Sequence, residues 1–237
     1  MKKDTQNSKI TMNLPNKLTL LRIILVPVIV IIYMVGINFE GFYAKPVVSF
    51  MPNFSWLNLV VLVIFGFAAF TDYLDGAIAR KRGIVTNFGK FADPLADKLL
   101  VYSVFVMMLH QNYLNNTMML ASTSKDTTAD IFEWWMLVVV LAREFIVTGV
   151  RYMAASNNKV IAASKLGKAK TIAQYIAVIV VLLFSAVTKS NGVLNELNII
   201  LVIISKISLY VMLVLTIISG FDYVVKNKEV FYDKKGK

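Results

Sequence analysis

The residues best suited to chemistry in this sequence are four aspartates within one short stretch. They are Asp72, Asp75, Asp93 and Asp97. The first two stand three positions apart and the last two four apart, so on helices each pair shares one face. Carboxylate oxygens bind hard divalent cations such as Mg²⁺, Mn²⁺ or Ca²⁺ and do not favour zinc. The spacing therefore predicts two acidic helix faces, which repel each other unless a positive charge lies between them.

A group of basic residues is the second feature that suits chemistry. Arg143 and Arg151 stand two helical turns apart in one apolar run and share a face, and Lys168 opens the next run. Arginine can bind a phosphate through two hydrogen bonds and lysine adds a point charge, so these cations suit an anionic group beside a metal site. Two plainer interpretations stay open. In the first, Arg143 pairs with Glu144 or with an aspartate and does not bind a phosphate. In the second, lysines such as Lys165 only follow the charge bias of cytoplasmic loops.

Arg22 stands inside the first apolar run of the chain. Asn16, Thr19 and Arg22 follow one another at intervals of three, so their side chains face roughly one way on a helix. An arginine inside a membrane span is costly and usually faces the interior of a helix bundle or a cavity. Alternatively, its long side chain extends to the lipid headgroups. The residues alone do not decide between the two positions.

Composition places the chain among integral membrane proteins. Hydrophobic residues make up 57% of the 237 residues and charged residues only 16%, which is too little charge for a soluble domain of this size. The sequence contains no cysteine, so disulfides and thiolate metal sites are excluded. The formal net charge is +11, but the lysines stand beside the apolar runs, where membrane lipids and not nucleic acid are the expected partners. The single histidine, His110, is expected at the membrane interface.

Six apolar runs predict an all-α, polytopic membrane protein with six transmembrane helices. The expected spans are 18–35, 56–79, 95–109, 135–152, 172–187 and 207–225. A span needs about 20 apolar residues, so the third and fifth runs must include flanking residues. The final tract is too long for one span and contains Lys206, so we expect 197–205 to lie at the far interface. The chain thus divides into an N-terminal segment (1–17), a six-helix transmembrane catalytic domain (18–225) and a basic tail (226–237).

The charges outside the spans predict the orientation in the membrane. Most lysines and arginines fall in four segments, 1–17, 80–92, 153–171 and 226–237. The opposite loops contain only Lys45, Lys125 and Lys189. Positive residues in short loops favour the cytoplasmic side. We therefore expect a multi-pass protein of the cell membrane with both termini and the acidic stretch facing the cytoplasm, and a polar outer loop over 110–130 to which we assign no chemistry.

The aspartates form part of a longer pattern, D-x2-D-G-x2-A-R-x8-G-x3-D-x3-D. Its positions are filled by Asp72, Asp75, Gly76, Ala79, Arg80, Gly89, Asp93 and Asp97. This pattern resembles the signature of the CDP-alcohol phosphotransferases at every position and in every gap. The entrance of the first run, from Pro15 to Arg22, also resembles the P-N-x-L-T-x-x-R segment of that family, which favours a position of Arg22 facing the site.

The resemblance implies a role for each part of the signature. Two divalent ions, Mg²⁺ or Mn²⁺, would be bound by Asp72, Asp75, Asp93 and Asp97. Asp97 would also act as the general base that takes a proton from the acceptor hydroxyl. The residues that would bind the CDP-lipid are Asn16, Thr19, Gly76, Ala79, Arg80 and Gly89. Among them, the small residues would let the nucleotide approach the helix backbone, and the arginine would meet its phosphates.

A second tract resembles one branch of the same family. Two segments resemble those of the bacterial phosphatidylglycerophosphate synthases. They are A-R-E-F-x-V-T-G-x-R, which begins at Ala142, and G-K-x-K-T-x-x-Q, which begins at Gly167. The resemblance implies transfer of a phosphatidyl group from CDP-diacylglycerol to sn-glycerol 3-phosphate. The acceptor's phosphate would then be bound by Arg143, Arg151 and Lys168, and the products would be phosphatidylglycerophosphate and CMP.

Two alternatives stay open at this point. Another alcohol, such as inositol phosphate or serine, could be the acceptor, although three cations favour a phosphorylated one. A cation-coupled transporter is the alternative from a different class. The sequence contains no second copy of the acidic signature, and the acids are expected at one membrane face and not at the midplane, which argues against a transporter. The sequence does not decide between a monomer and a homodimer.

Overall fold

The structure, a computed structural model, describes residues 13–39, 42, 46–48, 51–82, 87–121, 131–156, 161, 164–184 and 196–231. These residues contain six long α-helices, which are α1 (Leu14–Gly36), α3 (Trp56–Arg82), α4 (Asn87–Ala121), α5 (Trp134–Ser156), α6 (Lys165–Phe184) and α7 (Glu196–Lys226). An antiparallel hairpin of β1 (Pro46–Val48) and β2 (Met51–Ser55) precedes α3, and a 3₁₀ helix, η1 (Lys228–Phe231), follows α7.

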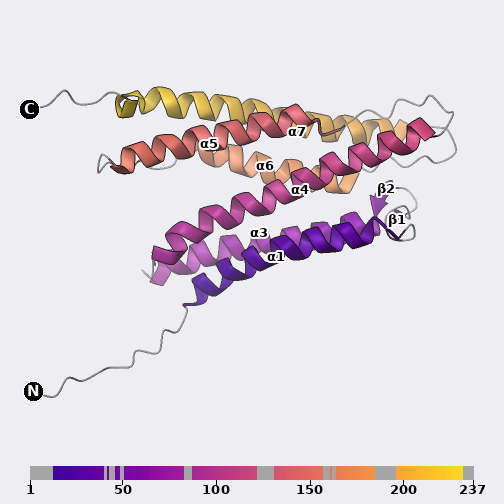
Figure 1. The fold of residues 1–237 in the computed structure, drawn as a ribbon, viewed down its shortest axis with the longest axis horizontal. Coiled ribbons are helices and arrows are strands. Elements are labelled where there is room, and N and C mark those ends of the chain that lie inside the picture. Colours follow the sequence, from indigo (N-terminus) through magenta and orange to yellow (C-terminus); the bar gives the residue numbers. More distant parts are fainter. Residues whose placement is uncertain are drawn as a thin grey trace, which may run out of the picture.

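The helices form two groups of three that lie side by side (Figure 1). In the first group α1 packs against α3 and α4. In the second group α7 packs against α5 and α6, and α6 joins the groups through its contacts with α3 and α4. Successive helices run in opposite directions, so α1 begins, α3 ends, α4 begins and α7 ends at the same end of the bundle. All four signature aspartates lie toward that end, because they stand near the end of α3 and the start of α4.

The core and the surface of the bundle are those of a membrane protein. Fully buried side chains such as Phe65, Leu100 and Phe105 form its centre, while large apolar side chains cover much of the outside. Phe145, for example, is 73% exposed. Among the described residues, three helices are long and apolar enough to cross a membrane, namely α1, α6 and the part Ile200–Lys226 of α7. The prediction of a helical membrane protein is confirmed to this extent. Six spans and a cytoplasmic position of both termini stay predictions.

Helix α4 is longer than the sequence pattern predicts. The polar pattern predicts an outer loop over 110–130, but α4 continues to Ala121. No glycine or proline stands between Leu109 and Ala121, so the hydrogen bonding of the helix continues after the apolar run has ended. His110 lies within this helix, with its Nδ1 atom 3.2 Å from the Tyr33 hydroxyl of α1. Hydrophobicity marks the part of a helix that is buried in lipid, and not the residue at which the helix ends.

The last apolar tract forms one continuous helix. α7 runs from Glu196 to Lys226 over 31 residues and includes Lys206, since lysine is a good helix former. The segment 197–205 is therefore not a separate element, and its position at the membrane interface stays a prediction. The hairpin β1–β2 is a small addition to the helical architecture. The hydrophobic pattern did not reveal it because its strands are only 3 and 5 residues long.

Candidate active site

The four signature aspartates surround one arginine side chain. The Nη1 atom of Arg22 donates hydrogen bonds to Asp72 Oδ1, at 2.6 Å, and to Asp97 Oδ1. Its Nη2 atom donates to Asp75 Oδ2 at 2.5 Å and lies 3.5 Å from Asp93 Oδ1. The Arg22 side chain is 0% exposed. The prediction that this arginine faces the site is therefore confirmed, and the alternative that it extends to the lipid headgroups is wrong.

Three helices contribute to this cluster, and their packing explains how one arginine reaches four carboxylates. α1 packs against both α3 and α4, so a single face of α1 meets the aspartates of both helices. Thr19 lies on that face, one turn before Arg22, and its hydroxyl donates a hydrogen bond of 2.5 Å to Asp93 Oδ1. The interval of three residues between Thr19 and Arg22 thus places both side chains on the acidic site, as the sequence predicts.

The cluster is buried on one side and open on the other. The Asp75 side chain is only 5% exposed, whereas the side chains of Asp72, Asp93 and Asp97 are 35%, 43% and 33% exposed. Four carboxylates and one guanidinium leave three negative charges uncompensated. An unbalanced acidic cluster that is partly accessible attracts further cations.

The chemistry of this donor set fits hard divalent ions, because every available ligand atom is a carboxylate or hydroxyl oxygen. As the side chains stand, however, no group of three or more carboxylate, imidazole or thiolate side chains within the described residues is arranged to hold one ion. The guanidinium of Arg22 lies between the carboxylates. Its Nε atom is buried and has no hydrogen-bond partner among the described residues. The four aspartates can therefore bind divalent ions only if the Arg22 guanidinium moves out from between them.

A second charged cluster forms around Glu144 of α5. Its Oε1 atom accepts hydrogen bonds from Lys170 Nζ at 2.6 Å and from Arg143 Nη1 at 2.8 Å. Its Oε2 atom lies 3.3 Å from Lys98 Nζ. Lys170 is almost completely buried and also donates to Gln174 Oε1 at 2.6 Å. The pairing of Arg143 with Glu144, which the sequence left open, is present in the structure, and it belongs to a network of three cations from three helices.

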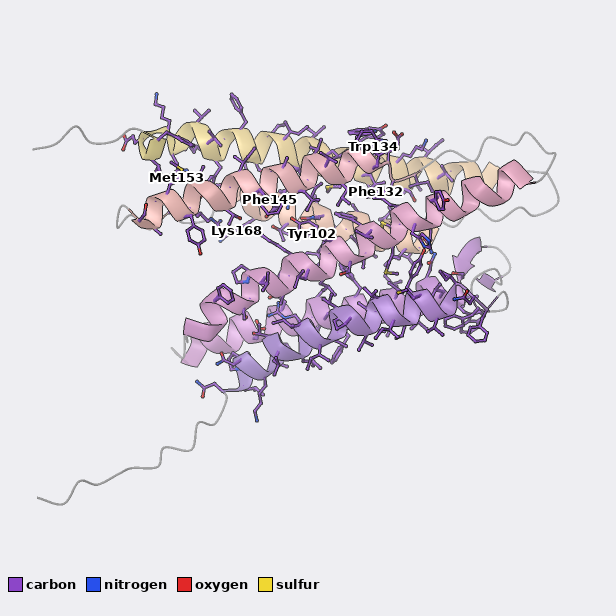
Figure 2. All side chains as sticks on the ribbon, viewed as in Figure 1. Tyr102, Phe132, Trp134, Phe145, Met153 and Lys168 are labelled. Carbon is purple, nitrogen blue, oxygen red and sulfur yellow. The ribbon has the colours of Figure 1, made fainter. Side chains whose placement is uncertain are left out.

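The predicted phosphate-binding residues occupy different surroundings. Arg143 Nη2 donates to Ser219 Oγ at 3.0 Å, and Arg151 Nε donates to Tyr223 OH at 3.2 Å. Ser219 and Tyr223 stand one turn apart on α7, so the two arginines share the face of α5 that meets α7, as their spacing predicts. Lys168 is exposed in the first turn of α6 (Figure 2). The structure does not show it beside Arg143.

Sequence reasoning missed the residues that connect the two clusters. Lys98 follows Asp97 directly in α4, and its Nζ atom donates to Thr148 Oγ1 of α5 at 2.9 Å. Tyr102 lies between the two groups of helices (Figure 2), and its buried hydroxyl has no hydrogen-bond partner among the described residues. Tyr175 of α6 packs on Phe65 of α3 with ring centroids 5.5 Å apart. A lysine directly after the last signature aspartate was the only signal that pointed to this connection.

Part of the predicted CDP-lipid site is outside what the structure describes. Gly76, Ala79 and Arg80 lie in the helical part of α3, but their side chains are outside the described residues. Asn16 is half-buried in the first turn of α1, and Gly89 is buried near the start of α4. The roles assigned to these five residues, and the role of Thr19 in binding the CDP-lipid, stay predictions.

Gly220 of α7 offers a test of how closely the second cluster is packed. A Cβ atom added at Gly220 would lie 2.8 Å from Arg143 Cγ. This carbon can move away only by a rotation about χ1 that also displaces the guanidinium from Glu144 and Ser219. We expect Gly220→Ala to lower the unfolding free energy by about 1–3 kcal/mol and to lower the Tm of the detergent-solubilised protein. Gly149→Ala is the matched control, because a Cβ there meets nothing within 4 Å. Equal Tm values for the two variants would contradict this packing.

Comparison with known proteins assigns the chain to a class. Residues 12–218 match the family of CDP-alcohol phosphatidyltransferases, and the chain belongs to this family. Members of the family generally use divalent metal ions. This agrees with the all-oxygen donor set of the four aspartates.

Several proteins similar to this chain share one name, CDP-diacylglycerol–glycerol-3-phosphate 3-phosphatidyltransferase. The protein of that name from Bacillus subtilis (strain 168) is 35% identical over 221 residues, which cover 92% of this chain and 96% of the relative. The one from Rickettsia felis is 34% identical over 94% of this chain and 99% of its own. The one from Salmonella choleraesuis is 32% identical over 70% of this chain and 74% of its own.

Proposed function

We propose that this protein transfers the phosphatidyl group of CDP-diacylglycerol to sn-glycerol 3-phosphate and releases phosphatidylglycerophosphate and CMP. The observation that carries the proposal is the complete acidic signature, gathered at one end of a helical bundle, in a chain that resembles enzymes named for this reaction over almost its whole length. The protein would thus act in the synthesis of anionic phospholipids.

Four carboxylates would hold the cofactor of the reaction. Asp72, Asp75 and Asp93 would bind two divalent ions, Mg²⁺ or Mn²⁺, and Asp97 would reach the second. When bound, two such ions neutralise a pyrophosphate, orient it and stabilise the departing CMP. Thr19 supports this assignment of Asp93, because its hydroxyl already fixes one carboxylate oxygen and thereby the orientation of the ligand.

Asp97 would move the proton. As the acceptor's hydroxyl oxygen forms a bond to the phosphorus that carries diacylglycerol, the bond between that phosphorus and the oxygen of CMP breaks. The proton of the hydroxyl then passes to the Asp97 carboxylate. Its side chain is 33% exposed, which leaves room for an acceptor to approach. It also stands next to Lys98, the residue that joins this helix to the second cluster.

The membrane organises the two substrates. The outer faces of the helices are apolar, so the acyl chains of CDP-diacylglycerol would stay in lipid while its headgroup reaches the aspartates at the end of the bundle. The lysine bias of 80–92 and 153–171 supports a cytoplasmic position of that end, where a water-soluble acceptor is available. Six spans with both termini in the cytoplasm agree with this arrangement. A homodimer is compatible with it but is not required.

The second cluster supports a phosphorylated acceptor. Arg143, Arg151 and Lys168 are the residues that we assign to the phosphate of glycerol 3-phosphate, and Lys170 and Lys98 stand around the same Glu144 as Arg143. Arg143, Lys170 and Lys98 carry three positive charges around the single carboxylate of Glu144. Two of these charges are left over, and the dianion of a phosphate monoester would balance them. Serine carries no such charge.

Turnover of CDP-diacylglycerol by the purified protein with a panel of acceptors tests this proposal. We expect product with sn-glycerol 3-phosphate and little with serine, glycerol or inositol phosphate. Arg151→Lys keeps the charge but loses the planar fork, so kcat/KM for glycerol 3-phosphate should fall roughly 10- to 100-fold. The KM for CDP-diacylglycerol should move much less. Lys165→Gln, an exposed change in the first turn of α6, is the control. Equal turnover of serine or inositol phosphate would contradict the acceptor assignment and leave the family chemistry intact.

A further inference from the structure

We propose that Arg22 is an internal counter-ion that competes with divalent metal ions for the four signature aspartates, and so sets the affinity of the site for those ions. The inference rests on the metal use in the proposed function, but it makes a separate statement. One residue of the protein itself opposes the loading of its own metal site.

The geometry around Arg22 is the first observation behind this inference. Its two Nη atoms contact one oxygen of each of the four carboxylates, and the longest of these contacts is 3.5 Å. Within the described residues no three acidic side chains are placed to share a metal ion. An ion can therefore join these oxygens only if they turn away from the guanidinium or the guanidinium moves.

The position of Arg22 is also incompletely satisfied. Its Nε atom is buried and lacks a hydrogen-bond partner among the described residues, and a buried donor without a partner is unfavourable. A movement that gives this atom a partner would offset part of the loss of contacts with the aspartates. Of the four carboxylates, Asp93 has the weakest contact with Arg22, since its Oδ1 is 3.5 Å from Nη2 and its side chain is 43% exposed, while its position is held by the Thr19 hydroxyl. We expect an incoming ion to displace the guanidinium from Asp93 first.

Electrostatics gives the sign of the effect. Arg22 is the one cation in contact with the four carboxylates among the described residues. Its removal leaves their mutual repulsion unrelieved, whereas bound divalent ions relieve that repulsion whether or not Arg22 is present. A change that destabilises only the metal-free state must strengthen metal binding by the same free energy. A residue that merely supported the ligands would act in the opposite direction, and its removal would weaken binding.

Binding of Mn²⁺ to Arg22→Gln and Arg22→Lys tests the inference without any turnover. Free Mn²⁺ is measured by electron paramagnetic resonance with detergent-solubilised protein and no substrate. We expect Arg22→Gln to bind Mn²⁺ roughly 10- to 100-fold more tightly than the wild type, the size of a typical coupling between two binding events. Arg22→Lys should bind with intermediate affinity, because a compact ammonium cannot span four carboxylates. The Tm of Arg22→Gln should fall in chelator and recover in Mn²⁺.

Lys17→Gln is the matched control, since it removes the same charge from an exposed position on the same helix and should leave Mn²⁺ affinity almost unchanged. Unchanged or weaker binding by Arg22→Gln overturns the inference, and so does equal tightening by Lys17→Gln. If Arg22→Gln does not fold, the Mn²⁺ affinity of Arg22→Lys tests the inference instead. An affinity of Arg22→Lys equal to or below that of the wild type would overturn the inference. Absence of Mn²⁺ binding by the wild type would instead refute the metal use in the proposed function.

Discussion

Chelation of divalent ions is expected to abolish phosphatidyl transfer by this protein, and Mg²⁺ or Mn²⁺ is expected to restore it. Among the ligands, Asp75→Asn should have the largest effect on metal binding. Its side chain is only 5% exposed, and its Oδ2 lies 2.5 Å from Arg22 Nη2. The substitution keeps the shape of the residue but removes one ligand charge. The loss in activity at a fixed ion concentration should exceed the roughly 10- to 100-fold that loss of an outer-shell partner costs.

Titration of activity with Mn²⁺ measures this effect, because a weakened site should need more metal to reach its maximal rate. Asp222→Asn is a suitable control. Asp222 is an acidic residue of α7 whose Oδ1 pairs with Lys226 Nζ at 2.7 Å, outside the signature. Full activity of the wild type in excess chelator would contradict the proposal that two divalent ions take part in the reaction. A metal requirement unchanged in Asp75→Asn would remove this residue from the ligand set.

Asp97→Asn is expected to separate chemistry from binding. If Asp97 is the general base, its loss should reduce kcat by about 10²–10⁴-fold, while the affinity for the CDP-lipid stays close to that of the wild type. Asparagine can still accept the hydrogen bond that Arg22 Nη1 gives to Asp97 Oδ1, so the fold of the site should be kept. The measurement is kcat and KM at saturating Mn²⁺, together with Mn²⁺ affinity in the absence of substrate.

Two results would contradict this role. A loss of Mn²⁺ affinity as large as that of Asp75→Asn would make Asp97 mainly a metal ligand. Near-normal turnover would exclude it from the mechanism. Asp97→Glu gives a further check, because it keeps the charge and the basic group but lengthens the side chain. Partial recovery of kcat relative to Asp97→Asn would support proton transfer at this position.

The two charged clusters meet on one helix. Asp97 and Lys98 are consecutive in α4, and successive residues of a helix point about 100° apart. One therefore faces Arg22 of α1, and the other faces Glu144 and Thr148 of α5. The cluster of the four aspartates lies on α1, α3 and α4. The second charged cluster lies on α5 and α6 and includes one residue of α4, Lys98. In the proposed reaction, the pyrophosphate of the CDP-lipid at the aspartates and the phosphate of the acceptor near Glu144 would place the two substrates on either side of α4.

Much of this site could be predicted from the sequence, because it depends on local spacing. The intervals within Asp72–Asp75 and Asp93–Asp97 determine shared helix faces, and the interval between Thr19 and Arg22 does the same on α1. Lipid is an apolar solvent, so the low charge content and the long apolar runs were sufficient for the membrane class. The signature aspartates also reveal the family without any knowledge of their contacts.

The tertiary structure alone decided which charges pair. Arg22 meets its four carboxylates across 50 to 75 residues of chain, and Lys170 meets Glu144 across 26, so only the packing of helices brings them together. Burial then selected Lys170 over the exposed Lys168 as a partner of Glu144, although both stand in the same basic tract. Sequence spacing gives the direction of a side chain on its own helix. The partner depends on which helix is packed opposite, and that is decided by how the apolar faces of the helices are buried against one another.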